Sequence, residues 1–270
     1  MDVPTMFEPY QVETDIDVIP SYFPIPIYGF LPVNAFVLKA SQPVLVDSGM
    51  LCLNSEFMEK LSSVINPADL RWLWLTHADP DHVGSLWSIL EAAPKLRIIT
   101  TFIGFGRLNV YKPVPMNRVY LLNPGQRIDV GDRVLTAVKP PSYDSPETTG
   151  FYDPKNAAFF CADCFGALLS EPKEKTSDIN LEKLKEGMTI WATIDAPWLH
   201  IIDRGLFEKK CSLIHDISPR HILSAHLPAA YDMTDILLEN LSNVPDAPPF
   251  LGPDQKALEK ILKPVTGRQL

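Results

Sequence analysis

The stretch LTHADPDHVG, residues 75–84, places two histidines and two aspartates within six positions, at the end of an apolar run, 70–75, that predicts a buried strand. Side chains at the end of a strand lie at the edge of the sheet, where a rigid scaffold holds them in a fixed arrangement. Imidazole nitrogen and carboxylate oxygen are the usual protein ligands of zinc, iron and manganese. A solvated loop with Asp81 as N-cap of the next helix explains one carboxylate and leaves both histidines without a role. The candidate metal ligands of this stretch are His77, Asp79, Asp81 and His82.

Length and composition limit the class of protein. The 270 residues are 46% hydrophobic, which suits a single domain over 1–270 with a substantial core. The net charge of −9 disfavours nucleic acid or an anionic membrane as a partner, because both attract clustered lysine and arginine. The N-terminal stretch is acidic, and no apolar run approaches the roughly 20 residues that span a bilayer. Together with four cysteines, which suit a reducing compartment, these features predict a cytoplasmic protein.

Short elements separated by prolines make up the rest of the sequence. Strands are expected as a hairpin of 33–40 with 43–49, then at 96–101, as short segments within 117–141, at 157–163 and at 221–226. Helices are expected at 55–65, 83–93, 196–216 and 255–263, with a helix start at GFG, 104–106. Loops are expected at 20–32 and, as a polar insertion or lid, at about 167–190. Two groups of strands, each followed by helices, predict an α/β protein with two sheets between helical layers.

Four further motifs follow the pattern of the first. They are LVDSG (45–49) with Asp47, YDSPETTGFY (143–152) with Asp144, FFCADCFG (159–166) with Asp163, and ILSAHLP (222–228) with His226. In this order the motifs resemble the metallo-β-lactamase superfamily, whose signature is His-x-His-x-Asp-His at the end of a strand. The signature stands here as HADPDH, with Asp79 at the second histidine.

The resemblance implies a four-layer αββα sandwich of two mixed β-sheets flanked by helices, with a two-metal site. By matching positions, one ion would be held by His77, Asp79 and Asp144, and the other by Asp81, His82 and His226. Asp163 would bridge the two ions.

Two histidines of the superfamily's first metal site are aspartates here. A cage of three histidines and four aspartates favours iron or manganese over zinc, because these harder ions prefer oxygen. The flavodiiron branch of the superfamily also has a carboxylate at the position of Asp79, as His-x-Glu-x-Asp-His. The chain departs from that branch at Asp144, where flavodiiron proteins keep a histidine, and we expect no flavodoxin-like half to accompany it. We therefore expect two metal ions per chain and neither FMN nor NAD.

Three functions fit these features. The first is a metal-dependent hydrolase, in which a metal-bound hydroxide, oriented by Asp81, attacks an ester, thioester, lactone or phosphoester. The second is a diiron protein that binds or reduces dioxygen or nitric oxide with electrons from a separate partner. The third is a pseudo-enzyme whose altered ligands bind metal weakly. The superfamily's base rate favours the hydrolase, which is an argument by analogy.

Other polar residues have simpler interpretations. Cys161 and Cys164 have the spacing of a redox pair, but they lie on a predicted strand and its exit, so two buried thiols are expected. His200 is expected to be a histidine with a satisfied hydrogen bond rather than a substrate contact. The polar insertion and the many prolines leave room for a homodimer contact.

Overall fold

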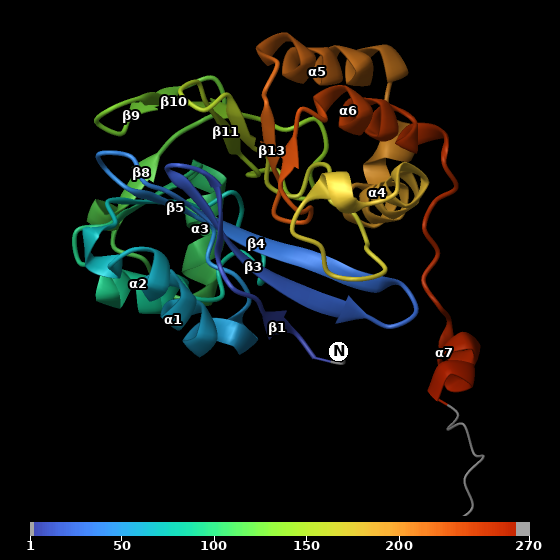
Figure 1. The fold of residues 1–270 in the computed structure, drawn as a ribbon, viewed down its shortest axis with the longest axis horizontal. Coiled ribbons are helices and arrows are strands. Elements are labelled where there is room, and N and C mark those ends of the chain that lie inside the picture. Colours follow the sequence, from blue (N-terminus) through green and yellow to red (C-terminus); the bar gives the residue numbers. More distant parts are fainter. Residues whose placement is uncertain (1–2, 263–270) are drawn as a thin grey trace, which may run out of the picture.

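The computed structural model describes residues 3–262, which form two β-sheets packed face to face with helices outside each sheet (Figure 1). In the first sheet the strand order is β1-β3-β4-β5-β6-β7-β8, with β2 paired to β3. Its strands are β1 Thr5–Met6, β2 Tyr10–Glu13, β3 Ile16–Ile25, β4 Gly29–Leu38, β5 Val44–Val46, β6 Trp72–Trp74, β7 Arg97–Thr100 and β8 Val119–Leu121.

The second sheet has the order β14-β13-β12-β11-β10-β9. Its strands are β9 Arg127–Asp129, β10 Val134–Val138, β11 Gly150–Asp153, β12 Ala158–Phe160, β13 His221–Leu223 and β14 Ala230–Tyr231. The helices are α1 Asn54–Val64, α2 Leu86–Ala92, α3 Phe102–Tyr111, α4 Leu181–Asp195, α5 Arg204–Ile217, α6 Thr234–Ser242 and α7 Gln255–Leu262. The predicted four-layer αββα sandwich is confirmed. Residue 263 of the expected helix 255–263 lies outside the described residues.

Three hydrophobic clusters fill the three spaces between the four layers. The first packs the helices of the N-terminal half, including Phe57 of α1, against Leu73 of the first sheet. The second lies between the sheets and contains Trp74 and Phe160. The third packs α4, α5 and α6 against the second sheet. Leu73 and Trp74 are neighbours on β6 and serve opposite faces, because successive side chains of a strand alternate. The apolar run before the motif therefore reflects a strand buried on both sides.

Parallel pairing brings strand ends to common edges. β5, β6, β7 and β8 pair in parallel in the first sheet, and β12 pairs in parallel with β13 in the second. The polar residues that follow β5 and β6 therefore lie side by side, as do those that follow β12 and β13. This topology places four of the motifs identified in the sequence around one point. The predicted hairpin of 33–40 with 43–49 is confirmed by the antiparallel pairing of β4 with β5.

The prediction of a loop at 20–32 is wrong. β3 and β4 form an antiparallel hairpin whose register runs from Ile16 opposite Leu38 to Ile25 opposite Gly29. The prolines that suggested a loop are accommodated within these strands, with Pro20 opposite Asn34. On its other side β3 pairs only with the short strands β1 and β2. Few hydrogen bonds between strands are therefore lost there because proline lacks an N–H.

The polar segment at 167–190 is in part a core element. Its second half belongs to α4, whose Leu184 and Met188 are buried in the cluster over the second sheet. The expected helix at 196–216 begins later, because α5 starts at Arg204 and is preceded by a 3₁₀ turn, Pro197–Ile201. A lid and a single domain over 1–270 stay predictions.

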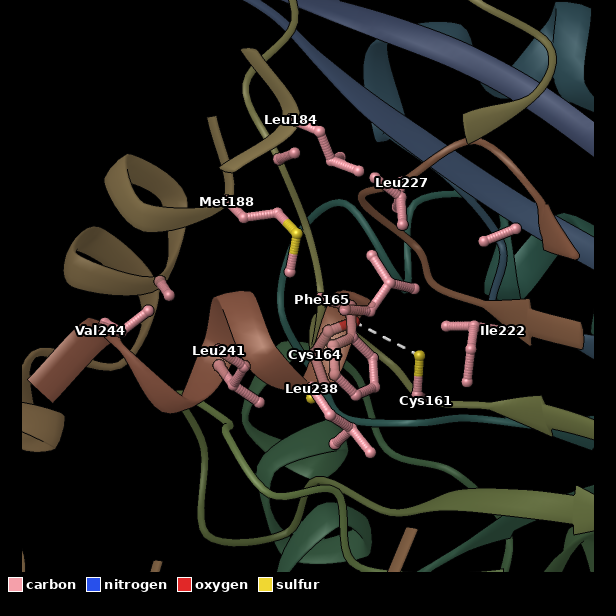
Figure 2. Close-up of a cluster of buried hydrophobic side chains, with 14 of the residues drawn as sticks. Cys161, Cys164, Phe165, Leu184, Met188, Ile222, Leu227, Leu238, Leu241 and Val244 are labelled. Carbon is pink, nitrogen blue, oxygen red and sulfur yellow. Dashed lines mark hydrogen bonds between the residues drawn. The ribbon is translucent and has the colours of Figure 1, made fainter. Parts of the chain in front are cut away.

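Cys161 and Cys164 are free, buried thiols, as predicted. Figure 2 shows them in the cluster with Met188 of α4 and Leu241 of α6, and the Cys161 thiol donates to the Cys164 carbonyl oxygen at 3.3 Å. Burial raises the pKa of both thiols above the ordinary value, which does not favour a reactive thiolate. Among residues 3–262, no helix combines the length and the apolar character that a membrane crossing requires.

Candidate metal centre

The HADPDH loop is clamped to the loop that follows β5. The Gly84 N–H donates to the Gly49 carbonyl oxygen, and the Ser48 N–H donates to the His82 carbonyl oxygen, both at 2.8 Å. A Cβ added at Gly84 would lie 2.2 Å from the Leu51 nitrogen, so only glycine permits this approach. The two neighbouring loops thus act as one rigid support for the candidate ligands.

Three imidazoles converge on the Asp163 carboxylate. Nε2 of His77 lies 3.2 Å from Oδ2 of Asp163, and Nε2 of both His82 and His226 lies 3.1 Å from Oδ1. All four side chains are almost fully buried. His77 and His82 come from the loop after β6, Asp163 follows β12 and His226 follows β13, so the cluster joins the two sheets.

The outer nitrogens of two of these imidazoles have partners that fix the rings. Nδ1 of His82 lies 2.9 Å from Oδ2 of Asp47, which also accepts the Thr76 hydroxyl at 2.8 Å. Nδ1 of His226 lies 2.8 Å from the Pro32 carbonyl oxygen, which can only accept a hydrogen bond. Such partners hold the proton on Nδ1 and leave the Nε2 lone pair free to bind a metal.

Asp81 and Asp144 lie near different imidazoles of the cluster. Oδ2 of Asp81 is 3.7 Å from Nε2 of His82 and 3.5 Å from Nε2 of His226. Oδ1 of Asp144 is 3.8 Å from Nε2 of His77. Two groups of candidate ligand atoms, each with all its atoms within 4.8 Å of one another, match the two predicted ligand sets. These sets are His77, Asp79, Asp144 and Asp81, His82, His226.

The structure therefore brings all seven predicted ligands together. It also shows that Asp81 does not cap the following helix, because α2 begins at Leu86 with Ser85 as its N-cap.

Arg107 of α3 is a neighbour of the cluster that the sequence did not reveal. Its guanidinium donates to Oδ1 of Asp79 at 2.8 Å and also to Glu147 and to the Ser145 hydroxyl. Glu147 is buried, with one carboxylate oxygen left without a hydrogen bond. The guanidinium thus joins Asp79 to the loop that carries Asp144. No local signal in the sequence distinguishes Arg107 from a surface arginine.

Asp195 is a second neighbour that the sequence analysis missed. It ends α4, and its carboxylate lies within 4.8 Å of ligand atoms of Asp144 and Asp163. Burial, followed by the charges of Asp163 and Asp144, raises the pKa of Asp195 to about 8. The sequence does contain a clue to Asp195. Leu184, Met188 and Ala192 are spaced as one buried helix face, and Asp195, three positions after Ala192, lies on the same face.

Burial and neighbouring charges together set the pKa values of the cluster. Burial alone would raise the pKa of Asp163, but the three histidines hold it well below its ordinary value. Burial would lower the pKa of His226, but the Asp163 and Asp81 carboxylates raise it to about 9. Burial, followed by the charges of Asp163 and Asp79, raises the pKa of Asp144 against the opposing effect of His77.

The donor set fits a bound metal. Nε2 of His82 and Oδ1 of Asp163 are buried and have no hydrogen-bond partner, although they lie 3.1 Å apart. In this orientation neither atom donates or accepts a hydrogen bond. Leaving buried polar atoms without hydrogen bonds costs free energy. Ligand atoms that face a shared ion lie in this way, because their lone pairs point at the ion and not at one another.

We expect metal affinity to increase with pH. With a pKa of about 9, His226 carries a proton at pH 7 that an incoming ion must displace. The affinity for Mn²⁺ should therefore rise roughly tenfold per pH unit for each displaced proton, and become constant above about pH 9. Calorimetric titration of the metal-free protein at several pH values, in buffers of different ionisation enthalpy, measures the affinity and the protons released.

The stability of the metal-free protein should decrease as the pH rises, which is opposite to the change in metal affinity. A folded-state pKa raised above the unfolded value of about 6.5 stabilises the fold below that pH. This stabilisation is lost as the pH rises through about 9, the pKa of His226.

A metal affinity that is the same at pH 7 and above pH 9 would contradict the assignment of His226 as a proton-bearing ligand.

His200 does not have the satisfied hydrogen bond that we expected. It lies in the 3₁₀ turn Pro197–Ile201, and its Nε2 is buried without a hydrogen-bond partner among the described residues. The neighbouring Trp198 donates instead to the Tyr143 carbonyl oxygen at 2.8 Å, next to Asp144. The prediction for His200 was therefore wrong, because no partner lies within hydrogen-bond distance of its Nε2 in the described part of the chain.

The two-sheet sandwich and the cluster of histidines and aspartates at its strand ends define a metallo-β-lactamase-type domain. The model of the family described as ODP family beta lactamase matches residues 31–221. The chain belongs to this family.

Similar proteins include diflavin flavoproteins and a nitric oxide reductase. The chain is 30% identical over 135 residues to the putative diflavin flavoprotein A 1 of Thermosynechococcus vestitus, a match that covers 50% of this chain and 24% of the relative. It is 26% identical over 192 residues to the nitric oxide reductase of Moorella thermoacetica, covering 70% of this chain and 48% of the relative. The chain thus spans from about a quarter to about half the length of these curated relatives.

Solved structures support the fold. The structure of rubredoxin oxygen:oxidoreductase from Desulfovibrio gigas superposes with a TM-score of 0.77 at 16% identity, covering 88% of this chain and 61% of that chain. At this identity the likeness shows the fold alone.

Proposed function

We propose that the chain is a non-haem diiron protein that binds dioxygen or nitric oxide and receives electrons from a separate partner. The observation that carries this proposal is the convergence of the Nε2 atoms of His77, His82 and His226 on the Asp163 carboxylate. Two irons, when bound by this cage, would supply the redox chemistry at which a diatomic gas is held.

The diiron interpretation is better supported than the hydrolase that the sequence favoured. The relatives are a nitric oxide reductase and diflavin flavoproteins. The cage also carries four candidate aspartate ligands, whose formal charge balances that of two divalent ions. Little net positive charge then remains to activate a water molecule for hydrolysis, whereas the ferric state is stabilised.

The protein's own residues hold the cage in a fixed geometry. Asp47 and the Pro32 carbonyl oxygen orient two imidazoles so that Nε2 faces inward. The ring of Trp191 on α4 lies against that of His226, with 4.7 Å between centroids, and restricts the movement of the imidazole. Asp81, which is less buried than the histidines, is suited to orient a bound ligand at the open side.

Electrons are assigned in this proposal to a separate partner. The matched part of the diflavin flavoprotein is only 24% of that relative, so the flavin in its name is not carried over to this chain. The absence of FMN and NAD, the cytoplasmic location and a homodimer contact stay predictions.

The proposal is tested with protein loaded with ferrous iron under nitrogen. We expect two irons per chain by elemental analysis, and a visible spectrum that changes reversibly when nitric oxide or dioxygen is added. His226→Ala should lose iron and the spectral response together. His215→Ala, which alters an exposed histidine on α5, should keep both.

A protein that binds zinc at both positions, ignores both gases and turns over a panel of esters and lactones would overturn the proposal. Such a result would restore the hydrolase. A protein without any bound metal would instead support the pseudo-enzyme.

A further inference from the structure

An open pocket of about 750 Å³ lies between α5 and the loop that joins β10 to β11. Leu206, Phe207 and Leu213 line it from the helix, and Pro140 and Pro141 line it from the loop. Pockets that hold small ligands commonly have volumes of roughly 300 to 1,000 Å³ and mainly apolar walls. The pocket therefore has the size and the lining of a small-molecule site, and none of the described residues that line it is a candidate metal ligand.

The helix α5 carries more apolar side chains than its packing on the second sheet uses. Phe207, Cys211 and Ile214 form its buried face. Leu206 and Leu213 are seven positions apart and share another face, where they are 63% and 56% exposed. Both leucines line the pocket. Exposed apolar side chains gathered around a hollow are typical of a surface that binds a ligand.

An aromatic pair adds to the walls of the pocket. The rings of Tyr143 and Trp198 have centroids 5.1 Å apart, and the Trp198 indole N–H donates to the Tyr143 carbonyl oxygen at 2.8 Å. Both residues line the pocket and are half-buried, so part of their apolar surface stays open. Aromatic rings that are already fixed in place can bind a flat apolar group with little further loss of conformational entropy.

Three lysines surround these apolar walls, namely Lys139, Lys209 and Lys210. Within residues 3–262, none of the three forms an ion pair with a carboxylate. The Lys139 ammonium donates to the Pro146 carbonyl oxygen at 2.9 Å and lies 3.6 Å from the centre of the Tyr143 ring. These contacts hold its charge at the pocket without neutralising it.

The carboxylates near the pocket are engaged elsewhere. Asp203 lines the pocket, but it caps α5 by accepting a backbone N–H of the first turn at 2.9 Å. Glu147 and Asp144 attract Lys139 from beyond ion-pair distance, while Glu147 pairs with Arg107 and Asp144 is a candidate metal ligand. The pocket thus has a local excess of positive charge in a chain whose net charge is −9.

We propose that this pocket binds a small anion with a flat apolar body, such as an aromatic carboxylate or sulfonate. The apolar body packs between the exposed leucines of α5 and the aromatic pair, and the anionic group faces the lysines. Burial of apolar surface supplies most of the affinity, and the charges set the orientation. The inference goes beyond the diiron function and does not depend on it.

The experiment titrates the full chain with two fluorescent probes that share the same aromatic rings. Anilinonaphthalene sulfonate carries an anionic group, and phenylnaphthylamine lacks it. We expect one saturable site per chain for the sulfonate. We also expect the sulfonate to bind more tightly than the uncharged probe, and this advantage to shrink as salt is added, because salt screens the lysines.

Replacing both exposed leucines, Leu206→Gln with Leu213→Gln, should weaken the binding of both probes roughly tenfold or more, because the apolar wall is lost. Both side chains are exposed, so the fold should be kept, and circular dichroism checks this. Leu251→Gln, which alters a leucine that is 86% exposed outside the pocket, is the matched control and should bind both probes as the unmodified protein does.

Replacing two lysines, Lys209→Gln with Lys210→Gln, should weaken the sulfonate roughly threefold to tenfold and leave the uncharged probe unchanged, since exposed charges contribute modestly. Lys185→Gln, on the exposed face of α4, is the matched control and should change neither. The inference is overturned if the leucine pair leaves the affinity for the sulfonate unchanged, or if the lysine pair affects both probes alike. Equal affinity of the unmodified protein for the two probes, or binding of the sulfonate without saturation, would overturn it as well.

Discussion

Replacing Asp163 by alanine is expected to remove both metal ions from the chain. Its two oxygens are shared among His77 on one side and His82 and His226 on the other, at 3.1 to 3.2 Å. Loss of a single outer-shell partner commonly lowers metal affinity roughly 10- to 100-fold, and loss of a shared ligand should exceed the upper end of that range. Elemental analysis after dialysis, together with calorimetry, measures the effect.

We expect Asp163→Ala to remain folded. Circular dichroism checks this, because it reports the two sheets and not the cage. Asp216→Ala, at the exposed end of α5, is the control and should bind metal as the unmodified protein does. If Asp163→Ala keeps one ion at full affinity, Asp163 belongs to a single site and the shared cage is wrong.

Replacing Asp47 by alanine should lower metal affinity roughly 10- to 100-fold, although Asp47 touches no ion in our proposal. The carboxylate accepts the Thr76 N–H and hydroxyl at 2.8 Å and holds Nδ1 of His82 at 2.9 Å. Without it, the proton of His82 is free to move to Nε2, where it blocks coordination. Asp47 also has a φ of 57°, which alanine tolerates poorly, so thermal stability should fall as well.

Asp47→Asn separates these effects. Asparagine keeps the size of the side chain and accepts the left-handed conformation, but it lacks the charge. We expect it to keep the thermal stability and to lose part of the metal affinity. Equal metal affinity in Asp47→Ala and the unmodified protein would show that the orientation of His82 does not depend on Asp47.

The ligands that follow strands could be predicted because a strand end is visible in sequence. An apolar run stops, and the polar residues after it lie at the sheet edge; this holds for His77, Asp163 and His226. Asp144 lies in a loop, and only the resemblance of YDSPETTGFY (143–152) to the family motif identified it.

Residues on helices could not be placed in the same way. The direction in which Arg107 points depends on how α3 packs over the first sheet, and a single sequence does not contain that information. α4 was missed because exposed lysines and glutamates at its start hide the buried stripe of Leu184, Met188 and Ala192. Asp195 was lost with it. The hairpin of β3 and β4 was missed because its prolines were interpreted by local propensity, although pairing with neighbouring strands overrides that propensity.

The parallel pairing of β12 with β13 has a consequence for the synthesis of the protein. β12 is translated long before β13, and the two strands meet only when the intervening helices have been made. His226 is therefore the last candidate ligand to leave the ribosome, and a nascent chain holds at most a partial cage. Under the proposed diiron function, the metal centre could be completed only after residue 226 has been synthesised.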